Sequence, residues 1–108
     1  MSFEIKSTPE FLAEAKKLAK KYSSLKNDIA ALAKSLADNP TQGTSLGKDV
    51  YKIRLSITSK GKGKSGGARV ITCVKIIAAT VYLVSIYDKS EQSDIPDKEL
   101  KDRINKIL

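Results

Sequence analysis

The chain has no histidine, only one cysteine and few aromatic residues. Without histidine it lacks the side chain that most often moves protons near neutral pH, which excludes Ser/His/Asp, Cys/His and zinc-hydrolase mechanisms that need that side chain. The single cysteine, Cys73, cannot form an intramolecular disulfide, and the sequence contains no Cys-x-x-Cys or Cys/His ligand set. This cysteine usage suits a reducing cytoplasm.

Long apolar runs are also missing. The N-terminal segment MSFEIKSTPEF lacks the apolar core of a signal peptide, and no stretch approaches the ~20 apolar residues of a membrane span. At 108 residues, we expect one domain, residues 1–108, with one modest core. The sequence therefore predicts a soluble, cytoplasmic protein with no membrane partner.

The carboxylates show no metal-binding pattern. Asp88, Glu91, Asp94 and Asp97 are grouped near the C-terminus, but their spacing matches no set of metal ligands. The Gly/Lys-rich segment 59–67 has neither Walker spacing nor a helix after it, so it does not predict a nucleotide-binding loop. We therefore expect no metal and no other cofactor.

What the sequence has in excess is positive charge, and the excess is localised. The formal net charge is +8, with 20 Lys and Arg residues against 12 Asp and Glu residues. Residues 48–75 hold eight cations against one aspartate, a local net charge of +7. The eight are Lys48, Lys52, Arg54, Lys60, Lys62, Lys64, Arg69 and Lys75. Solubilising charge would be spread along the chain, so this concentration favours a binding surface for RNA, DNA or an acidic protein.

Two segments that read as strands carry part of this charge. In residues 50–58 apolar and polar side chains alternate, which leaves Lys52 and Arg54 on the face away from the apolar residues. In residues 68–74 the same alternation sets Arg69 on the less apolar face. If the two strands pair antiparallel, these three cations converge on one open sheet surface.

Capping residues and prolines predict three helices. Thr8 caps the first, and Ser23 or Ser24 begins a second that ends before Pro40. A C-terminal helix begins at Pro96. The short joint between the first two helices indicates an antiparallel hairpin.

The remaining segments complete an α+β fold. Residues 2–7 form a short strand, residues 41–48 form a loop with Leu46 tucked beneath it, and the apolar run after Val74 divides near residues 78–80 into two strands. The order β-α-α-β-β-β-α predicts an N-terminal helix hairpin packed on one face of a small, mostly antiparallel sheet. The opposite face would carry the basic residues.

Three segments carry a resemblance that spans nearly the whole chain: LGKDVYKIRL at 46–55, KSGGARVITCV at 64–74 and VYLVSIYDKSE at 81–91. With the element order, they resemble the RelE/ParE superfamily of bacterial and archaeal type II toxins, in a subgroup whose turn is lengthened by a KGKGKSGGAR pattern. The resemblance implies one of two activities. Members of the RelE branch are ribosome-dependent mRNA endonucleases, whereas ParE members inhibit DNA gyrase. A cognate antitoxin, typically acidic, silences both.

The resemblance also assigns residues. Lys52 and Arg54 match the two basic positions on the RelE active strand. Arg69 matches the arginine that follows the turn, and Lys89 matches a basic residue that follows the last strand. These four positions are therefore the catalytic candidates that the resemblance implies.

The chain departs from the family pattern at one position. RelE toxins carry a functionally important tyrosine near the C-terminus, where Asp94 or Ile95 lies here, and Tyr87 is the nearest candidate to replace it. Three functions stay open: an mRNA endonuclease acting on translating ribosomes, a ParE-like gyrase inhibitor, and an inactive homologue that only binds its antitoxin. The basic residues favour the first, and the missing tyrosine favours the other two.

Metal-free RNA cleavage is compatible with these residues because RNA supplies its own nucleophile, the 2′-hydroxyl. Arg54 and Arg69 suit the phosphate, since a guanidinium stays charged and binds oxygens in a fork. Lys52 is the candidate base, on the hypothesis that neighbouring cations favour its neutral form. Lys89 or Tyr87 would support the leaving oxygen.

Five further lysines are predicted to touch RNA phosphates without reading sequence. They are Lys48, Lys60, Lys62, Lys64 and Lys75. The lysines of segment 59–67 would act from a mobile basic flap, with Gly66 and Gly67 supplying positive φ for its turn. Aromatic residues for base stacking are sparse, which fits an enzyme that depends on the ribosome to present mRNA.

Overall fold

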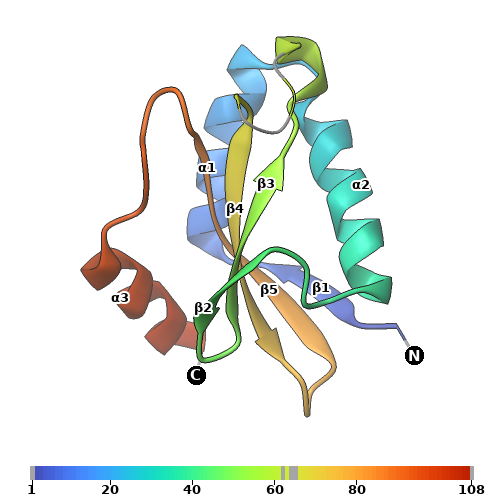
Figure 1. Cartoon of the computed structure of the whole chain (residues 1–108), viewed down its shortest axis with the longest axis vertical. Helices are drawn as coiled ribbons and strands as arrows, with labels where there is room; N and C mark the ends of the chain where they lie inside the picture. Colours follow the sequence, from blue (N-terminus) through green and yellow to red (C-terminus); the bar gives the residue numbers. More distant parts are fainter. Residues whose placement is uncertain (1, 62, 64–65, 108) are drawn as a thin grey trace.

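A mostly antiparallel sheet is the centre of the computed structural model, which describes residues 2–61, 63 and 66–107. Within them, the strands lie in the order β1-β5-β4-β3-β2 (Figure 1). They are β1 (Glu4–Ser7), β2 (Thr44–Gly47), β3 (Val50–Leu55), β4 (Ala68–Lys75) and β5 (Thr80–Asp88). β1 pairs parallel to β5, and the other neighbouring pairs are antiparallel. The predicted α+β fold is confirmed.

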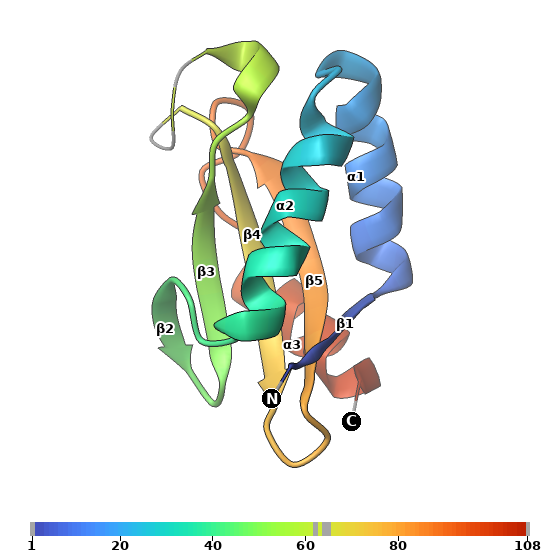
Figure 2. The same ribbon diagram turned by 90° about the vertical axis from the view of Figure 1, so that its right-hand side faces the viewer.

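Two N-terminal helices cover one face of this sheet. α1 (Pro9–Lys21) and α2 (Leu25–Asp38) lie side by side along it (Figure 2). Thr8 caps α1 as predicted, because its Oγ1 accepts a hydrogen bond from the Phe11 N–H at 3.2 Å. Phe11 and Leu25 are fully buried among apolar side chains of the strands. In the described part of the chain, no helix has both the length and the apolarity needed to cross a bilayer.

A third helix, α3 (Asp97–Ile107), lies on the other face of the sheet (Figure 1). Leu100, Ile104 and Ile107 form its half-buried apolar stripe. They pack on a second apolar cluster made of Val50, Ile71, Cys73, Val84, Tyr87 and Ile95. We expected this face to be open, and that expectation is wrong in part. α3 covers a portion of it because an otherwise polar helix still has one apolar stripe to bury.

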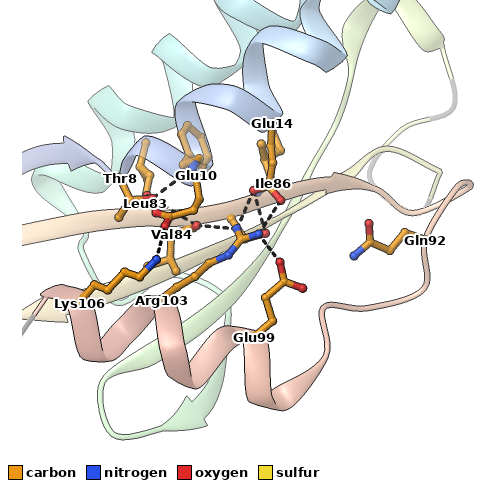
Figure 3. Close-up of polar contacts among 12 residues, drawn as sticks. Thr8, Glu10, Glu14, Leu83, Val84, Ile86, Gln92, Glu99, Arg103 and Lys106 are labelled. Carbon is orange, nitrogen blue, oxygen red and sulfur yellow. Dashed lines mark hydrogen bonds and ion pairs between the residues drawn. The ribbon is translucent and has the colours of Figure 1, made fainter.

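Part of the outer edge of β5 is covered by side chains rather than by a strand (Figure 3). β1 pairs only with residues 80–83 of β5. Beyond them, where β5 carries a bulge against β4, Glu14 Oε1 accepts a hydrogen bond from the Ile86 N–H at 3.3 Å. Arg103 Nη1 donates to the Val84 carbonyl at 3.2 Å. The two side chains thus form hydrogen bonds with backbone groups of β5 that a further strand would otherwise have paired with.

The same two side chains fix α3 to α1 (Figure 3). Arg103 donates from Nη1 to Glu14 Oε1 at 2.8 Å and from Nη2 to Glu14 Oε2 at 3.0 Å, which is a forked contact. Nη2 also donates to Glu99 Oε1 at 2.6 Å. The Arg103 side chain is 9% exposed. By contrast, Lys106 pairs with Glu10 at 3.1 Å with a side chain that is 70% exposed.

Two local expectations near β2 are wrong. Residues 44–47, expected within a loop, form a strand paired with β3. Leu46, expected to be tucked beneath that loop, is 45% exposed. Both errors have one cause. Every residue of β2 is exposed, so the strand has no buried face, and its sequence lacks the apolar–polar alternation that predicts a strand. The predicted break in the apolar run is confirmed, since β4 ends at Lys75 and β5 begins at Thr80.

The Glu14–Arg103 pair should contribute more to stability than the Glu10–Lys106 pair. Glu14→Gln leaves a shielded guanidinium without its forked partner, and we expect the free energy of unfolding to fall by about 2 kcal/mol. Glu10→Gln removes an exposed pair and should cost only about 0.5 kcal/mol. Urea unfolding of both variants measures the difference. Equal losses would show that shielding by the β5 edge does not set the strength of the clamp.

Candidate functional site

Four predicted residues lie on the same face of three neighbouring strands. Arg54 of β3 is the direct partner of Arg69 of β4, which is in turn the partner of Tyr87 of β5. Lys52 precedes Arg54 by two residues on β3 and therefore points to the same side. Ile53, which lies between them, packs under the helix hairpin instead. The strand register thus brings the three cations together, as the alternation predicted.

These four side chains differ in their access to solvent. Arg54 is exposed and Lys52 is half-buried, whereas Arg69 and Tyr87 are each 4% exposed. Arg69 Nη1 donates to the carbonyl of Ala68 at 3.2 Å. Arg54 is therefore the guanidinium that a ligand from solvent meets first, and Arg69 adds a buried positive charge beside it.

A carboxylate to which the sequence assigned no role lies among these residues. Asp94, in the loop between β5 and α3, accepts hydrogen bonds from Lys52 Nζ at 3.1 Å and from the Tyr87 hydroxyl at 3.0 Å. The Ile95 N–H donates to Oδ1 of the same carboxylate at 2.9 Å. Burial acts to raise the pKa of this carboxyl, but the hydrogen bonds from Lys52, Ile95 and Tyr87 outweigh it and lower the pKa. The carboxylate is thus held ionised against Lys52.

The Tyr87 phenol is arranged as a hydrogen-bond donor. Burial first, and the hydrogen bond to Asp94 second, raise the pKa of Tyr87 to about 12. A phenol with that pKa keeps its proton through the physiological range, so it donates rather than abstracts. Its side of the sheet is set by its pairing with Arg69 beyond the bulge in β5, because that strand is buried on both faces and carries no alternating signal. Its pairing with Asp94 depends on the path of the following loop, which no local pattern specifies.

Lys48 and Lys75 extend the basic surface away from Arg54. With Lys52 they line a groove of about 920 Å³ between the β2–β3 turn and α3. Val50 and Cys73 contribute apolar surface to the same groove. Lys52 therefore lies between the groove and Arg54, so that cationic side chains follow β3 from the turn toward its far end.

Lys60 does not join this surface. Its Nζ lies 2.8 Å from Asp88 Oδ1, a carboxylate with a fully buried side chain, and 5.4 Å from the centre of the Tyr22 ring. The hydroxyls of Tyr22 and Ser90 also donate to Asp88, at 2.5 Å and 2.7 Å. The hydrogen bond to Asp88 raises the pKa of Lys60. The structure differs here from the predicted RNA contact: this ammonium group anchors the loop instead of reaching outward.

The start of the basic loop is held at further points. The 3₁₀ turn Thr58–Lys60 follows β3, and the backbone N–H and hydroxyl of Thr58 donate to Asp28 at 3.0 Å and 2.6 Å. The Ser59 N–H donates to Ser24 Oγ at 2.8 Å. Both partners belong to the start of α2 and its cap. The expectation of a mobile flap is therefore wrong for this end of the loop.

The end of the loop is shaped by a close backbone contact. A Cβ at Gly67 would overlap the Leu55 carbonyl oxygen, so this glycine is needed for space and not for the positive φ that we expected. Lys89, exposed just beyond β5, donates its N–H to the Gly67 carbonyl at 3.2 Å. The remaining predicted RNA contacts, Lys62 and Lys64, lie outside the described residues.

The chemistry of this face suits an anion with several oxygens. Arg54 offers a forked donor, Lys52 an ammonium group and Tyr87 a hydroxyl, all from one sheet. Across residues 2–61, 63 and 66–107, no cluster of three or more Cys, Asp or Glu side chains could hold a metal ion. Asp94 is the carboxylate that the structure places in contact with Lys52 and Tyr87.

Comparison with known proteins identifies similar sequences and folds. A family model described as the RelE toxin of the RelE/RelB toxin–antitoxin system matches residues 5–107. An arginine-to-alanine double mutant of E. coli RelE in the free state is 18% identical, with a TM-score of 0.68 over 100% of both chains. The isolated E. coli RelE toxin is 17% identical, with a TM-score of 0.62 over 99% of this chain and 100% of that one.

A third similar structure is the intact E. coli RelBE toxin–antitoxin complex. It is 19% identical, with a TM-score of 0.51 over 81% of this chain and 96% of that one. At such identities the structural likeness establishes the fold alone. The family model is independent support, because it matches the sequence over nearly its whole length.

Asp88 should stabilise the protein in a pH-dependent way. Burial acts to raise the pKa of Asp88, but hydrogen bonds from Lys60, Tyr22 and Ser90 lower it well below its ordinary value. A carboxyl with a lowered folded-state pKa contributes stability above its unfolded pKa of about 4 and loses it progressively at lower pH. Asp88→Asn should therefore cost about 3 kcal/mol at pH 7.

The difference in unfolding free energy between wild type and Asp88→Asn should narrow as the pH falls below about 4. Urea titrations at pH 7, 4 and 2 measure that difference directly. A gap that stays constant over this range would contradict the buried ion pair as its source.

Proposed function

Because this chain belongs to the RelE toxin family of toxin–antitoxin systems, we propose that it is a metal-independent endonuclease that cuts mRNA on the ribosome. The observation that carries the proposal is the row of Arg54, Arg69 and Tyr87 across three strands, with Lys52 beside it. Guanidinium groups and a phenol on one face supply the hydrogen-bond donors that stabilise the transition state of phosphodiester cleavage.

In the proposed reaction the RNA 2′-hydroxyl attacks the adjacent phosphorus and the bond to the 5′-oxygen breaks. A 2′,3′-cyclic phosphate and a 5′-hydroxyl result, and the 2′-hydroxyl proton passes to water. Arg54, with the buried charge of Arg69 beside it, stabilises the negative charge that builds on the phosphoryl oxygens. Tyr87 gives its proton to the leaving 5′-oxygen and regains one from water, so no net proton is consumed; Lys89 is the alternative donor.

The role of Lys52 changes from the one we expected. A lysine crowded by cations would favour its neutral form and act as a base. In the structure its Nζ instead donates a hydrogen bond to the Asp94 carboxylate at 3.1 Å. Lys52 therefore enters the proposed mechanism as a cationic donor to phosphate.

Dependence on the ribosome is supported by the scarcity of accessible aromatic surface. Tyr87 is buried, and Tyr51 and Tyr82 are half-buried, so few rings are available for stacking bases. Charged contacts to phosphate hold RNA in any sequence. The ribosome would then supply the ordered mRNA strand that this face cannot select by itself.

An acidic antitoxin is the second partner that we propose. The E. coli RelBE complex is a toxin of similar fold together with its antitoxin. The net charge of +8 on the present chain would steer an acidic protein toward it. The proposed cytoplasmic location is consistent with both partners.

A ParE-like gyrase inhibitor is the alternative function, and one observation favours it. Asp94 and Ile95 lie where the family carries its C-terminal tyrosine, and Tyr87 reaches the site from β5 instead. An inactive homologue that only binds its antitoxin has the same support. Neither alternative requires the Arg54–Arg69–Tyr87 row to touch a phosphodiester.

Single substitutions on the sheet face test the nuclease. Arg54→Ala and Lys52→Ala each remove an accessible donor, and each should lower mRNA cleavage by about 100-fold or more. Lys16→Ala, which removes an exposed lysine from α1, should leave cleavage within about twofold because an exposed charge far from the reaction contributes little. Primer extension on transcripts after induction maps the cuts, and circular dichroism confirms that each variant is folded.

The same experiment separates the three functions. Cuts within coding regions that disappear in Arg54→Ala support the nuclease. Intact transcripts with a gyrase-dependent DNA-damage response support the ParE-like alternative. Intact transcripts without growth arrest leave the antitoxin-binding homologue.

A further inference from the structure

Three hydrogen-bond donors converge on the Asp94 carboxylate, and two of them belong to the proposed catalytic face. Lys52 Nζ and the Tyr87 hydroxyl reach it from the sheet at 3.1 Å and 3.0 Å, and the Ile95 N–H reaches it from its own loop at 2.9 Å. We propose that the space between Lys52 and Tyr87 is a phosphate-binding position, and that Asp94 fills it until an RNA phosphodiester displaces the carboxylate.

The chemistry of the donors carries this assignment. An ammonium group and a hydroxyl that both donate to one carboxylate are arranged for an oxyanion, and a phosphodiester likewise presents two oxygens that share one negative charge. A phosphate cannot join Asp94 there, because two like charges within hydrogen-bond distance repel each other. Lys52 therefore binds either the Asp94 carboxylate or an RNA phosphate.

The Asp94 side chain can rotate away from Lys52 while the Asp94 backbone keeps its position. The side chain is 58% exposed, so its ion pair with Lys52 is of the solvent-screened, weak kind. The backbone is fixed on both sides: Gln92 Nε2 donates to the Asp94 carbonyl at 2.8 Å, and the Ile95 side chain is only 5% exposed in the second apolar cluster. Rotation of one side chain therefore opens the position, and α3 stays in place.

The groove beyond Lys52 continues the path of a polyanion. Lys48, Lys75 and Lys101 line it together with Lys52. Asp97, at the start of α3, is a second acidic residue of the same groove. It has no hydrogen bond to Lys52 or Tyr87 among the contacts of the described residues, which makes it the matched control for the loss of one negative charge.

The test measures RNA affinity without cleavage, and it rests on the proposed function in that the ligand is RNA. A fluorescent 2′-O-methyl oligonucleotide cannot be cut, because its nucleophile is blocked. Asp94→Ala should bind it at least about fivefold more tightly than Asp97→Ala does.

A double substitution isolates the contact. In Lys52→Ala the further change Asp94→Ala should give no more affinity than Asp97→Ala does, because the freed donor is absent. Equal effects of Asp94→Ala and Asp97→Ala, or a gain that persists without Lys52, would overturn the proposal in favour of a general charge effect. Weaker binding by Asp94→Ala would overturn it in favour of a carboxylate that positions the site.

Inorganic phosphate separates this proposal from the nuclease itself. NMR titration of the folded Asp94→Ala protein should show phosphate shifting the Lys52 and Tyr87 signals, with smaller shifts in wild type. If phosphate binds there and no variant binds RNA, the phosphate position stands and the proposed function fails. If RNA binds and phosphate leaves both residues unshifted in Asp94→Ala, the proposed position fails, whereas the nuclease is decided separately by the cleavage map.

Discussion

The forked pairing of Arg103 with Glu14 is the interaction on which the rest of the structure depends. It joins α3 to α1 along the edge of β5 that continues beyond the residues paired with β1, and it satisfies backbone groups of that edge as well. α3 buries only a narrow apolar stripe, so a polar clamp has to supply what packing does not. With α3 docked, the preceding loop has a fixed end, and Ile95 and Asp94 are placed against the basic face.

The parts of the site that could be predicted are those set by strand periodicity. Side chains two residues apart on a strand share a face whatever the rest of the fold does, so Lys52 and Arg54 were placed correctly by spacing alone. Antiparallel pairing of β3 with β4 then adds Arg69 to the same face. The cap at Thr8 was equally local, because a capping hydroxyl and a helix N-terminus lie within one turn of each other.

The parts that could not be predicted depend on contacts between distant segments. Asp94 meets Lys52 across 42 positions of sequence, and Lys60 meets Asp88 across 28. The residues next to each lysine in the sequence do not indicate its partner. Lys52 was therefore expected to act as a base, and Lys60 was expected to contact RNA. The exposure of Leu46 could not be predicted for a local reason. A strand with no buried face has no apolar–polar periodicity in its sequence.

The pairing of β1 with β5 makes folding depend on contacts between distant parts of the chain. β1 lies parallel to β5, with Glu4 opposite Thr80, and Glu14 of α1 pairs with Arg103, 89 positions further along the chain. Contacts of such long sequence separation require a large loop to close before they contribute any stability. The architecture therefore predicts slower folding than a fold of the same size built mainly from local contacts.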